Sequence, residues 1–202
     1  MSRIAAVILA AGRSTRFGEE PKVTAELDGK PLVRHVAEAA LASQARPVLV
    51  VVGHAAERTC AALAGLDVEI VHSADFTKGL AHSLRAGFAG LSQDVDGAIV
   101  LLADMPRISP RVIDRLIEAF ANAGAPRAAV PVYGGRRGNP VLLGSRLFGA
   151  LGALEGDCGA REILGADVVE CAIEDEAVTS DIDTQDDLLR LAGRAQASAI
   201  KR

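Results

Sequence analysis

The segment Ile4-Ala-Ala-Val-Ile-Leu-Ala-Ala-Gly12 opens with an unbroken apolar run that ends in glycine. A short apolar run without alternation is typical of a strand buried on both faces, as in a parallel sheet covered by helices. Similar runs follow at Val48–Val52, Val68–Val71, Gly97–Ala103 and Ala128–Val132. Segments with apolar residues at helical spacing separate them, namely Pro31–Leu41, Ala55–Leu63, Leu80–Ala89 and Pro110–Ala121. The alternation predicts an α/β fold, a three-layer α/β/α sandwich with a Rossmann-like, mostly parallel sheet.

The composition favours one globular domain. The chain has 202 residues, 50% of them hydrophobic, and a formal net charge of −4. We expect a single domain over residues 1–192 and a frayed tail over 193–202. The negative charge and the scarcity of aromatic residues disfavour a nucleic-acid-binding protein. The three cysteines form neither an even disulfide set nor a C-x-x-C pair, which favours a reducing compartment. We find no signal-peptide pattern and no apolar run of about 20 residues, and therefore expect a cytoplasmic protein.

Two helix starts can be predicted from capping residues. Ser109 precedes Pro110, which suits an N-cap followed by the first helical position. Thr184 lies three residues before Asp187, which resembles a capping box with Asp in place of Glu or Gln. We therefore expect a last helix over Gln185–Leu191.

The loop after the first strand predicts an anion-binding site. Gly12 permits a sharp turn that presents backbone N–H groups, and Arg13, Arg16 and Lys22 add cationic charge within the following residues. In α/β sheets, ligands gather beyond the carboxyl ends of the strands, where this loop begins. The spacing matches neither a dinucleotide fingerprint nor a Walker A loop, and a solvated surface loop remains the structural alternative.

Aspartates follow a buried strand and precede the last helix. Asp104 comes directly after Gly97–Ala103, and Asp181 and Asp183 lie in the segment before Thr184. A carboxylate that faces a triphosphate needs a divalent cation between them, and Mg²⁺ bound by one or two carboxylates and phosphate oxygens is the usual solution. Turn formation and helix capping are the structural alternatives for these aspartates.

The loop motif Leu9-Ala-Ala-Gly-x-x-x-Arg-x-Gly-x-x-x-Lys22 is followed by several others. They are Gly79-x-x-x-Ser83, Asp104-Met-Pro106, Arg137-Gly-Asn-Pro140, Gly156-Asp-x-Gly-Ala-Arg161 and Asp181-Ile-Asp-Thr184. In composition and order, these motifs resemble the molybdenum cofactor cytidylyltransferase group of the glycosyltransferase-A-like nucleotidyltransferases. The resemblance implies the fold of nucleotide-diphospho-sugar transferases. Three details depart from the family pattern: three residues separate Gly18 from Lys22, Ala103 replaces the usual glycine before Asp104, and Gln185 stands where proline is usual.

The resemblance also implies residue roles. Lys22, Arg16 and Asp104 would be catalytic, and Mg²⁺ would be bound by Asp104 and Asp183, with Asp181 as the lesser candidate. The nucleotide would contact Leu9, Ala10, Ala11, Gly12, Arg13, Gly18, Lys22, Gly79 and Ser83. The phosphorylated acceptor would contact Arg137, Asn139, Pro140, Asp157 and Arg161.

These roles together predict a magnesium-dependent nucleotidyltransferase that transfers CMP from CTP to the terminal phosphate of molybdopterin and releases pyrophosphate. Ala11, where guanylyl-transferring relatives carry glycine, favours cytosine over the larger guanine. A molybdoenzyme apoprotein is a further expected partner. Guanylyl transfer to the same pterin, cytidylyl transfer to another phosphorylated molecule, and a non-catalytic molybdopterin carrier or insertion chaperone remain open. An oxidoreductase ranks lower because no nicotinamide-binding fingerprint is present.

Overall fold

A single large sheet forms the centre of the computed structural model, which describes residues 2–18, 20–124 and 126–199. Within these residues the sheet has eight strands in the order β10-β7-β9-β6-β1-β4-β5, with β8 paired to β7. Its strands are β1 (Ile4–Ala10), β4 (Val48–Val52), β5 (Glu69–His72), β6 (Gly97–Leu102), β7 (Ala128–Tyr133), β8 (Arg136–Arg137), β9 (Val141–Gly144) and β10 (Val168–Ala172). A separate hairpin pairs β2 (Glu26–Leu27) with β3 (Lys30–Pro31).

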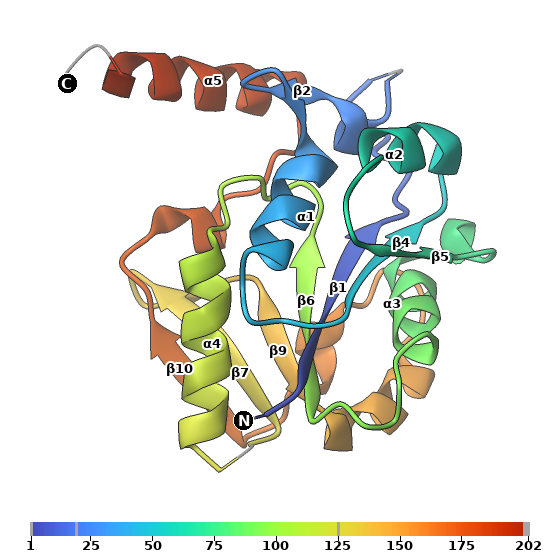
Figure 1. Ribbon diagram of the computed structural model, residues 1–202, viewed down its shortest axis with the longest axis vertical. Coiled ribbons are helices and arrows are strands. Elements are labelled where there is room, and N and C mark those ends of the chain that lie inside the picture. The colour runs from blue at the N-terminus through green and yellow to red at the C-terminus, as the bar shows by residue number, and fades with distance from the viewer. Residues whose placement is uncertain (1, 19, 125, 200–202) are drawn as a thin grey trace.

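Helices cover both faces of the sheet. The α-helices are α1 (Leu32–Leu41), α2 (Ala56–Ala62), α3 (Leu80–Ala89), α4 (Pro110–Asn122) and α5 (Gln185–Ala199). In Figure 1, α1 and α4 lie across the face of the sheet nearest the viewer. One buried cluster joins that face to α1 and α4, and a second joins the other face to α3 and to the 3-10 helix Ser145–Ala153. The predicted three-layer α/β class is confirmed.

The central strands are parallel and match the expected apolar runs. β1 pairs in parallel with β4 on one side and β6 on the other, and every residue of β1 and β4 is buried. Ser109 caps α4 by accepting a hydrogen bond from the backbone N–H of Val112, with Pro110 at the helix start, as the sequence predicts. β9 was not expected: it runs antiparallel between β6 and β7, and so makes the sheet mixed.

The last helix starts where the capping motif predicts. Thr184 Oγ1 accepts a hydrogen bond from the backbone N–H of Asp187, at 3.2 Å, and Asp187 Oδ2 accepts one from the backbone N–H of Thr184, at 2.9 Å. The helix then continues to Ala199, well past the expected end at Leu191 and into the segment expected to be frayed. Residues 200–202 of that tail lie outside the described residues.

A small third cluster joins the start of α5 to the loop after β1. Phe17, Leu27, Leu32 and Ile182 are buried together, and Leu188 and Leu191 of α5 pack against them. Phe17 is only 4% exposed although its neighbours in the loop face solvent. The cluster therefore holds the loop, the β2–β3 hairpin and the beginning of α5 in one place.

Among the described helices, none has the length and apolar character that crossing a membrane requires.

The capping box should make the stability of the protein depend on pH. Hydrogen bonds from Thr184, its side chain first, lower the pKa of Asp187 below its ordinary value of 3.8. A lowered carboxyl pKa contributes stability that is present above the ordinary value and is lost as the pH falls through the lower native value. Replacing Asp187 with Asn should therefore reduce the urea midpoint at pH 7, and this difference should shrink as the pH falls below 3.8. Urea titrations at pH 7 and at a series of pH values below 3.8 measure it.

Asp186→Asn is the matched control, because it removes an acidic charge from the same helical turn. An equal loss in both variants at pH 7 would mean that general helix-dipole electrostatics, and not the capping box, carries the effect.

Candidate active site

The loop after β1 and the aspartate after β6 meet at one edge of the sheet. β1 and β6 are parallel neighbours, so their carboxyl ends lie side by side. The backbone N–H of Ala103 donates to the carbonyl of Leu9 at 3.2 Å, which extends the pairing just beyond β6. Asp104 consequently begins its turn next to the start of the glycine loop.

Lys22 lies between two carboxylates that come from distant parts of the chain. Its Nζ is 2.7 Å from Asp104 Oδ2 and 3.3 Å from Asp183 Oδ1. Arg16 Nη1 is 2.8 Å from Asp183 Oδ2. The Lys22 side chain is 10% exposed and that of Arg16 is 75% exposed. The ammonium is therefore a fixed part of the site, whereas the guanidinium reaches it from solvent.

Backbone contacts explain how Asp183 reaches Asp104. The N–H of Ile182 donates to the carbonyl of Asp104 at 3.0 Å, and the Ile182 side chain is buried in the third cluster. Asp181 and Asp183 flank Ile182. The N–H of Asp183 also donates to Asp187 Oδ2 at 3.3 Å, so the capping box of α5 holds the acidic segment in register.

Three carboxylates offer a site for a divalent cation. Asp104, Asp181 and Asp183 each present an oxygen within 4.8 Å of the others. Asp104 Oδ1 is buried and has no hydrogen-bond partner among the described residues. Hard carboxylate oxygens are the ligands that Mg²⁺ and Mn²⁺ prefer, and an orphaned buried carboxylate oxygen is costly unless a cation contacts it. The donor set fits such an ion, and Asp181, the lesser candidate by sequence, belongs to it.

A cavity of about 500 Å³ opens in front of this charged centre. Twelve residues predicted from the sequence line it: Leu9, Ala10, Ala11, Gly12, Arg13, Arg16, Lys22, Gly79, Ser83, Asp104, Asp157 and Asp183. Asp181, the lesser candidate for a metal ligand, lines it as well. A cavity of this size lies within the range of small-molecule sites.

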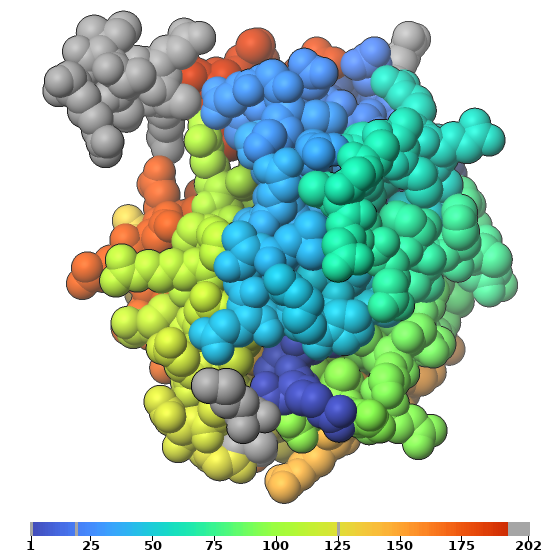
Figure 2. Space-filling view, viewed as in Figure 1, coloured from blue at the N-terminus to red at the C-terminus, as the bar shows by residue number. Residues whose placement is uncertain are grey.

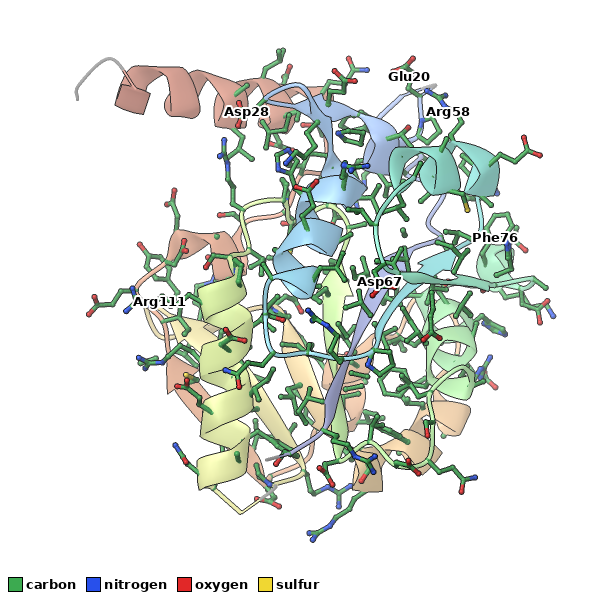
Figure 3. The ribbon with its side chains drawn as sticks, viewed as in Figure 1. Glu20, Asp28, Arg58, Asp67, Phe76 and Arg111 are labelled. Carbon is green, nitrogen blue, oxygen red and sulfur yellow. The ribbon has the colours of Figure 1, made fainter. Side chains whose placement is uncertain are left out.

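Sequence reasoning missed several lining residues. They are Ser14, Thr15, Val23, Phe76, Thr77, Leu80 and Leu102. Phe76 has the clearest structural signature, because a side chain at Gly53 would come within 2.7 Å of it. Figure 3 shows Phe76 near the end of β5. A lone aromatic residue in a polar connecting segment gives no periodic signal by which it could be found.

Gly79 has a packing role at the start of α3. A Cβ on Gly79 would lie 2.2 Å from the carbonyl oxygen of Gly156, and its φ of +109° is one that other residues rarely adopt. The same carbonyl accepts a hydrogen bond from the N–H of Ala81, at 3.0 Å. The turn at Gly156 is thereby docked on α3, and this brings Asp157 to the cavity beside Ser83.

Five predicted site residues lie outside the cavity lining. Gly18 is exposed, and a Cβ there would be 3.3 Å from the amide nitrogen of Gln185. The other four are Arg137, Asn139, Pro140 and Arg161, all predicted to contact the acceptor. Arg137 pairs with Glu170 at 2.7 Å on the surface, and the N–H of Asn139 donates to the carbonyl of Val178 at 2.7 Å.

Comparison with known proteins gives similarity over nearly the whole chain. Nicotine blue oxidoreductase from Paenarthrobacter nicotinovorans is 29% identical over 204 residues, which cover 93% of this chain and 96% of that protein. The crystal structure of Rv0371c from Mycobacterium tuberculosis H37Rv matches with a TM-score of 0.83 and 28% identity, covering 95% of this chain and 98% of that one. Rv0371c has also been solved in complex with manganese, and that structure matches with a TM-score of 0.77.

A nucleotidyl transferase from Methanothermobacter is 25% identical, with a TM-score of 0.79, over 98% of this chain and 100% of that one. The model of the MobA-like NTP transferase domain matches residues 6–171. That match includes the loop after β1, Lys22 and Asp104, and it ends before Asp181 and Asp183. With the sheet, the charged cavity and this match in agreement, the chain belongs to the MobA-like NTP transferase family of the nucleotidyltransferase superfamily.

Proposed function

We propose that this protein is a magnesium-dependent cytidylyltransferase that transfers CMP from CTP to the terminal phosphate of molybdopterin and releases pyrophosphate. The observation that carries the proposal is the position of Lys22 between Asp104 and Asp183, at the end of a loop with two further cations and in a cavity. This arrangement supports binding of a polyanion together with a cation. The resemblance of the motifs to the molybdenum cofactor cytidylyltransferase group supports a phosphorylated pterin as the acceptor.

The chain's own residues would neutralise charge and align the reactants. An oxygen of the acceptor phosphate attacks the α-phosphorus of CTP, a new P–O bond forms, and the bond to the β-phosphate breaks with its electron pair leaving on pyrophosphate. The acceptor needs no general base, because the second pKa of a phosphate monoester is about 6. Arg13, Arg16 and the loop N–H groups would bind the departing phosphates, and Lys22 would bind near the α-phosphate.

Asp104, Asp181 and Asp183 would hold Mg²⁺ through the oxygens that lie within 4.8 Å of one another. The bound ion supplies charge neutralisation for the phosphate oxygens. Removing one such electrostatic contact costs about 3–4 kcal/mol of transition-state stabilisation, which is a loss of roughly 10²–10³ in rate. We place the reaction in the cytoplasm, where the three free cysteines would remain reduced.

The decisive experiment is pyrophosphate release by the purified protein with molybdopterin, Mg²⁺ and each of the four nucleoside triphosphates. We expect release with CTP and a stoichiometric dinucleotide product. A preference for GTP would mean that the activity is guanylyl transfer and not cytidylyl transfer. Molybdopterin binding without pyrophosphate release would instead indicate a carrier or an insertion chaperone for a molybdoenzyme.

A parallel assay addresses the oxidoreductase named among the relatives. Consumption of reduced nicotinamide with a quinone-like dye that is lost in Asp104→Asn, with no pyrophosphate release from any nucleotide, would contradict nucleotidyl transfer as the function of this site.

Ala11 should influence the choice of base. Its side chain is 1% exposed and lines the cavity, and a Cβ on Gly53 would come within 2.9 Å of the Ala11 methyl group. The methyl group thus packs against Gly53 where Ala11 borders the cavity, and we expect it to limit the room for a purine base. Ala11→Gly should raise kcat/KM for GTP relative to CTP by about tenfold, the scale of one methyl group in a pocket. Competition between the two nucleotides measures the ratio of their kcat/KM values. If Ala11→Gly leaves this ratio unchanged, Ala11 does not determine which base is bound.

Asp104 should control binding of the divalent cation. Asp104→Asn removes the charge of the carboxylate that carries the orphaned oxygen, and should weaken Mn²⁺ binding at least tenfold. Electron paramagnetic resonance of free Mn²⁺ measures the affinity without requiring catalysis. Asp94→Asn is the control, because Asp94 pairs with Arg3 on the surface. Equal Mn²⁺ affinities in both variants would show that Asp104 is not a ligand.

A further inference from the structure

A second cavity lies beside the first, beneath α5. It has a volume of about 720 Å³, and its walls come from three places: the turn after Asp104, the segment that follows β10, and α5. Its lining residues include Pro106, Arg107, Asp175, Asp181, Arg190 and Leu191. Figure 1 shows α5 projecting from the body of the protein above the segment after β10. No predicted nucleotide or acceptor residue lines this cavity.

The two cavities share a wall at the proposed cation site. Asp181 lines both of them, whereas Asp183 lines the first and Ile182 the second. The short segment Asp181–Asp183 is therefore a partition that carries two of the three clustered carboxylates. A molecule in the second cavity would reach the α-phosphate of a nucleotide in the first by extending past this partition.

Arg107 is the cationic residue of the second cavity that could bind an anionic ligand. Its Nη2 is 3.1 Å from Asp28 Oδ2, and the two side chains are 39% and 43% exposed. Figure 3 labels Asp28 beside α5. Because an exposed ion pair of this kind contributes little to stability, a phosphate dianion can replace the Asp28 carboxylate. Arg190, the other cation, is 74% exposed and pairs with Asp187 one turn away on α5.

The remaining walls combine apolar surface with carboxylates that can accept hydrogen bonds from a ligand. Pro106, Ala177 and Leu191 contribute apolar surface, and carboxylates lie around it. Asp175 Oδ1 accepts a hydrogen bond from the N–H of Ala177, at 3.0 Å, which fixes that carboxylate at the rim. Carboxylates in fixed positions bind neighbouring N–H donors, such as those on the edge of a 2-amino-pyrimidinone ring.

The Arg-Gly-Asn-Pro motif packs against the backbone of a segment that lines this cavity. A Cβ on Gly138 would lie 2.1 Å from the carbonyl oxygen of Val178, and the N–H of Asn139 donates to the same carbonyl. Val178 belongs to the 3-10 helix Glu176–Thr179, which forms part of the cavity wall. The motif thus acts on the second cavity through the backbone, although its own side chains lie outside the lining.

From this geometry we propose that the second cavity is the acceptor subsite, and that Arg107 binds the acceptor phosphate. The inference rests on the proposed nucleotidyl transfer. The class of acceptor is a phosphate monoester attached to a planar heterocycle with adjacent N–H donors. The phosphate lies at the Asp181–Asp183 partition, the ring lies between α5 and the segment after β10, and the nucleotide occupies the first cavity.

Arg107→Ala is the principal test, measured by pyrophosphate release with CTP and molybdopterin. It should raise KM for molybdopterin at least tenfold and leave KM for CTP within about twofold. Arg107→Lys should restore part of the affinity. Asp28→Ala is the matched control, since it breaks the same ion pair but leaves the guanidinium. It should leave both KM values unchanged or lower the KM for molybdopterin.

Two outcomes would overturn the proposal while nucleotidyl transfer stands. In one, Asp28→Ala raises KM for molybdopterin as much as Arg107→Ala does. The weaker binding would then result from breaking the ion pair and not from losing the guanidinium. In the other, Arg137→Ala raises KM for molybdopterin and Arg107→Ala does not.

A binding measurement covers the case in which the wild-type protein releases no pyrophosphate. The probe is 6-hydroxymethylpterin phosphate, whose fluorescence reports binding directly. Binding by the wild type that is lost in Arg107→Ala would support the acceptor subsite even though the transfer reaction had failed. No binding by the wild type, or equal binding by both proteins, would overturn it.

Discussion

The site depends on one buried ammonium group that forms ion pairs with two carboxylates. Lys22 comes from the loop after β1, Asp104 from the end of β6, and Asp183 from the segment before α5. Without a cation in this position, the carboxylates of Asp104 and Asp183 would repel each other in a partly desolvated place. The ion pairs therefore hold together three segments that are distant in sequence, and they concentrate charge of both signs at one edge of the sheet.

Apolar packing keeps these charges in register. Phe17 anchors the loop in the third cluster, next to Ile182, while the capping box fixes the backbone of Asp183. The long glycine loop has few backbone constraints of its own, so a buried aromatic ring within it determines where Arg16 can reach. Residues that contact no substrate, such as Phe17, thus determine the geometry of the residues that we propose to contact it.

Much of the fold could be predicted from sequence, because buried parallel strands appear as continuous apolar runs. β1 and β4 have the expected boundaries, and α3 and α4 begin at the expected residues. β9 could not be predicted from an apolar run, because four apolar residues are too few to distinguish a strand from a buried loop. Its position between β6 and β7 depends on contacts between residues that are distant in sequence. Its antiparallel direction follows from those contacts as well.

The candidate site shows the same division. Lys22, Asp104 and the glycine loop were predictable because each adjoins a strong strand signal, and the cavity contains them. Phe76 and the second cavity were not, because they depend on how connecting segments fold over the sheet edge. Likewise, Arg137 and Asn139 belong to a recognisable motif, but the hydrogen bond from the backbone N–H of Asn139 to the carbonyl of Val178 depends on the folded structure.

The position of Asp183 in the chain has a consequence for biosynthesis. All strands of the sheet are complete at Ala172, and the acidic segment and α5 follow it. As a ribosome releases the chain from its N-terminus, the sheet can assemble while Lys22 still has only one of its two carboxylate partners. The charged centre is consequently completed only after the segment that carries Asp183 has been synthesised and has folded against the sheet.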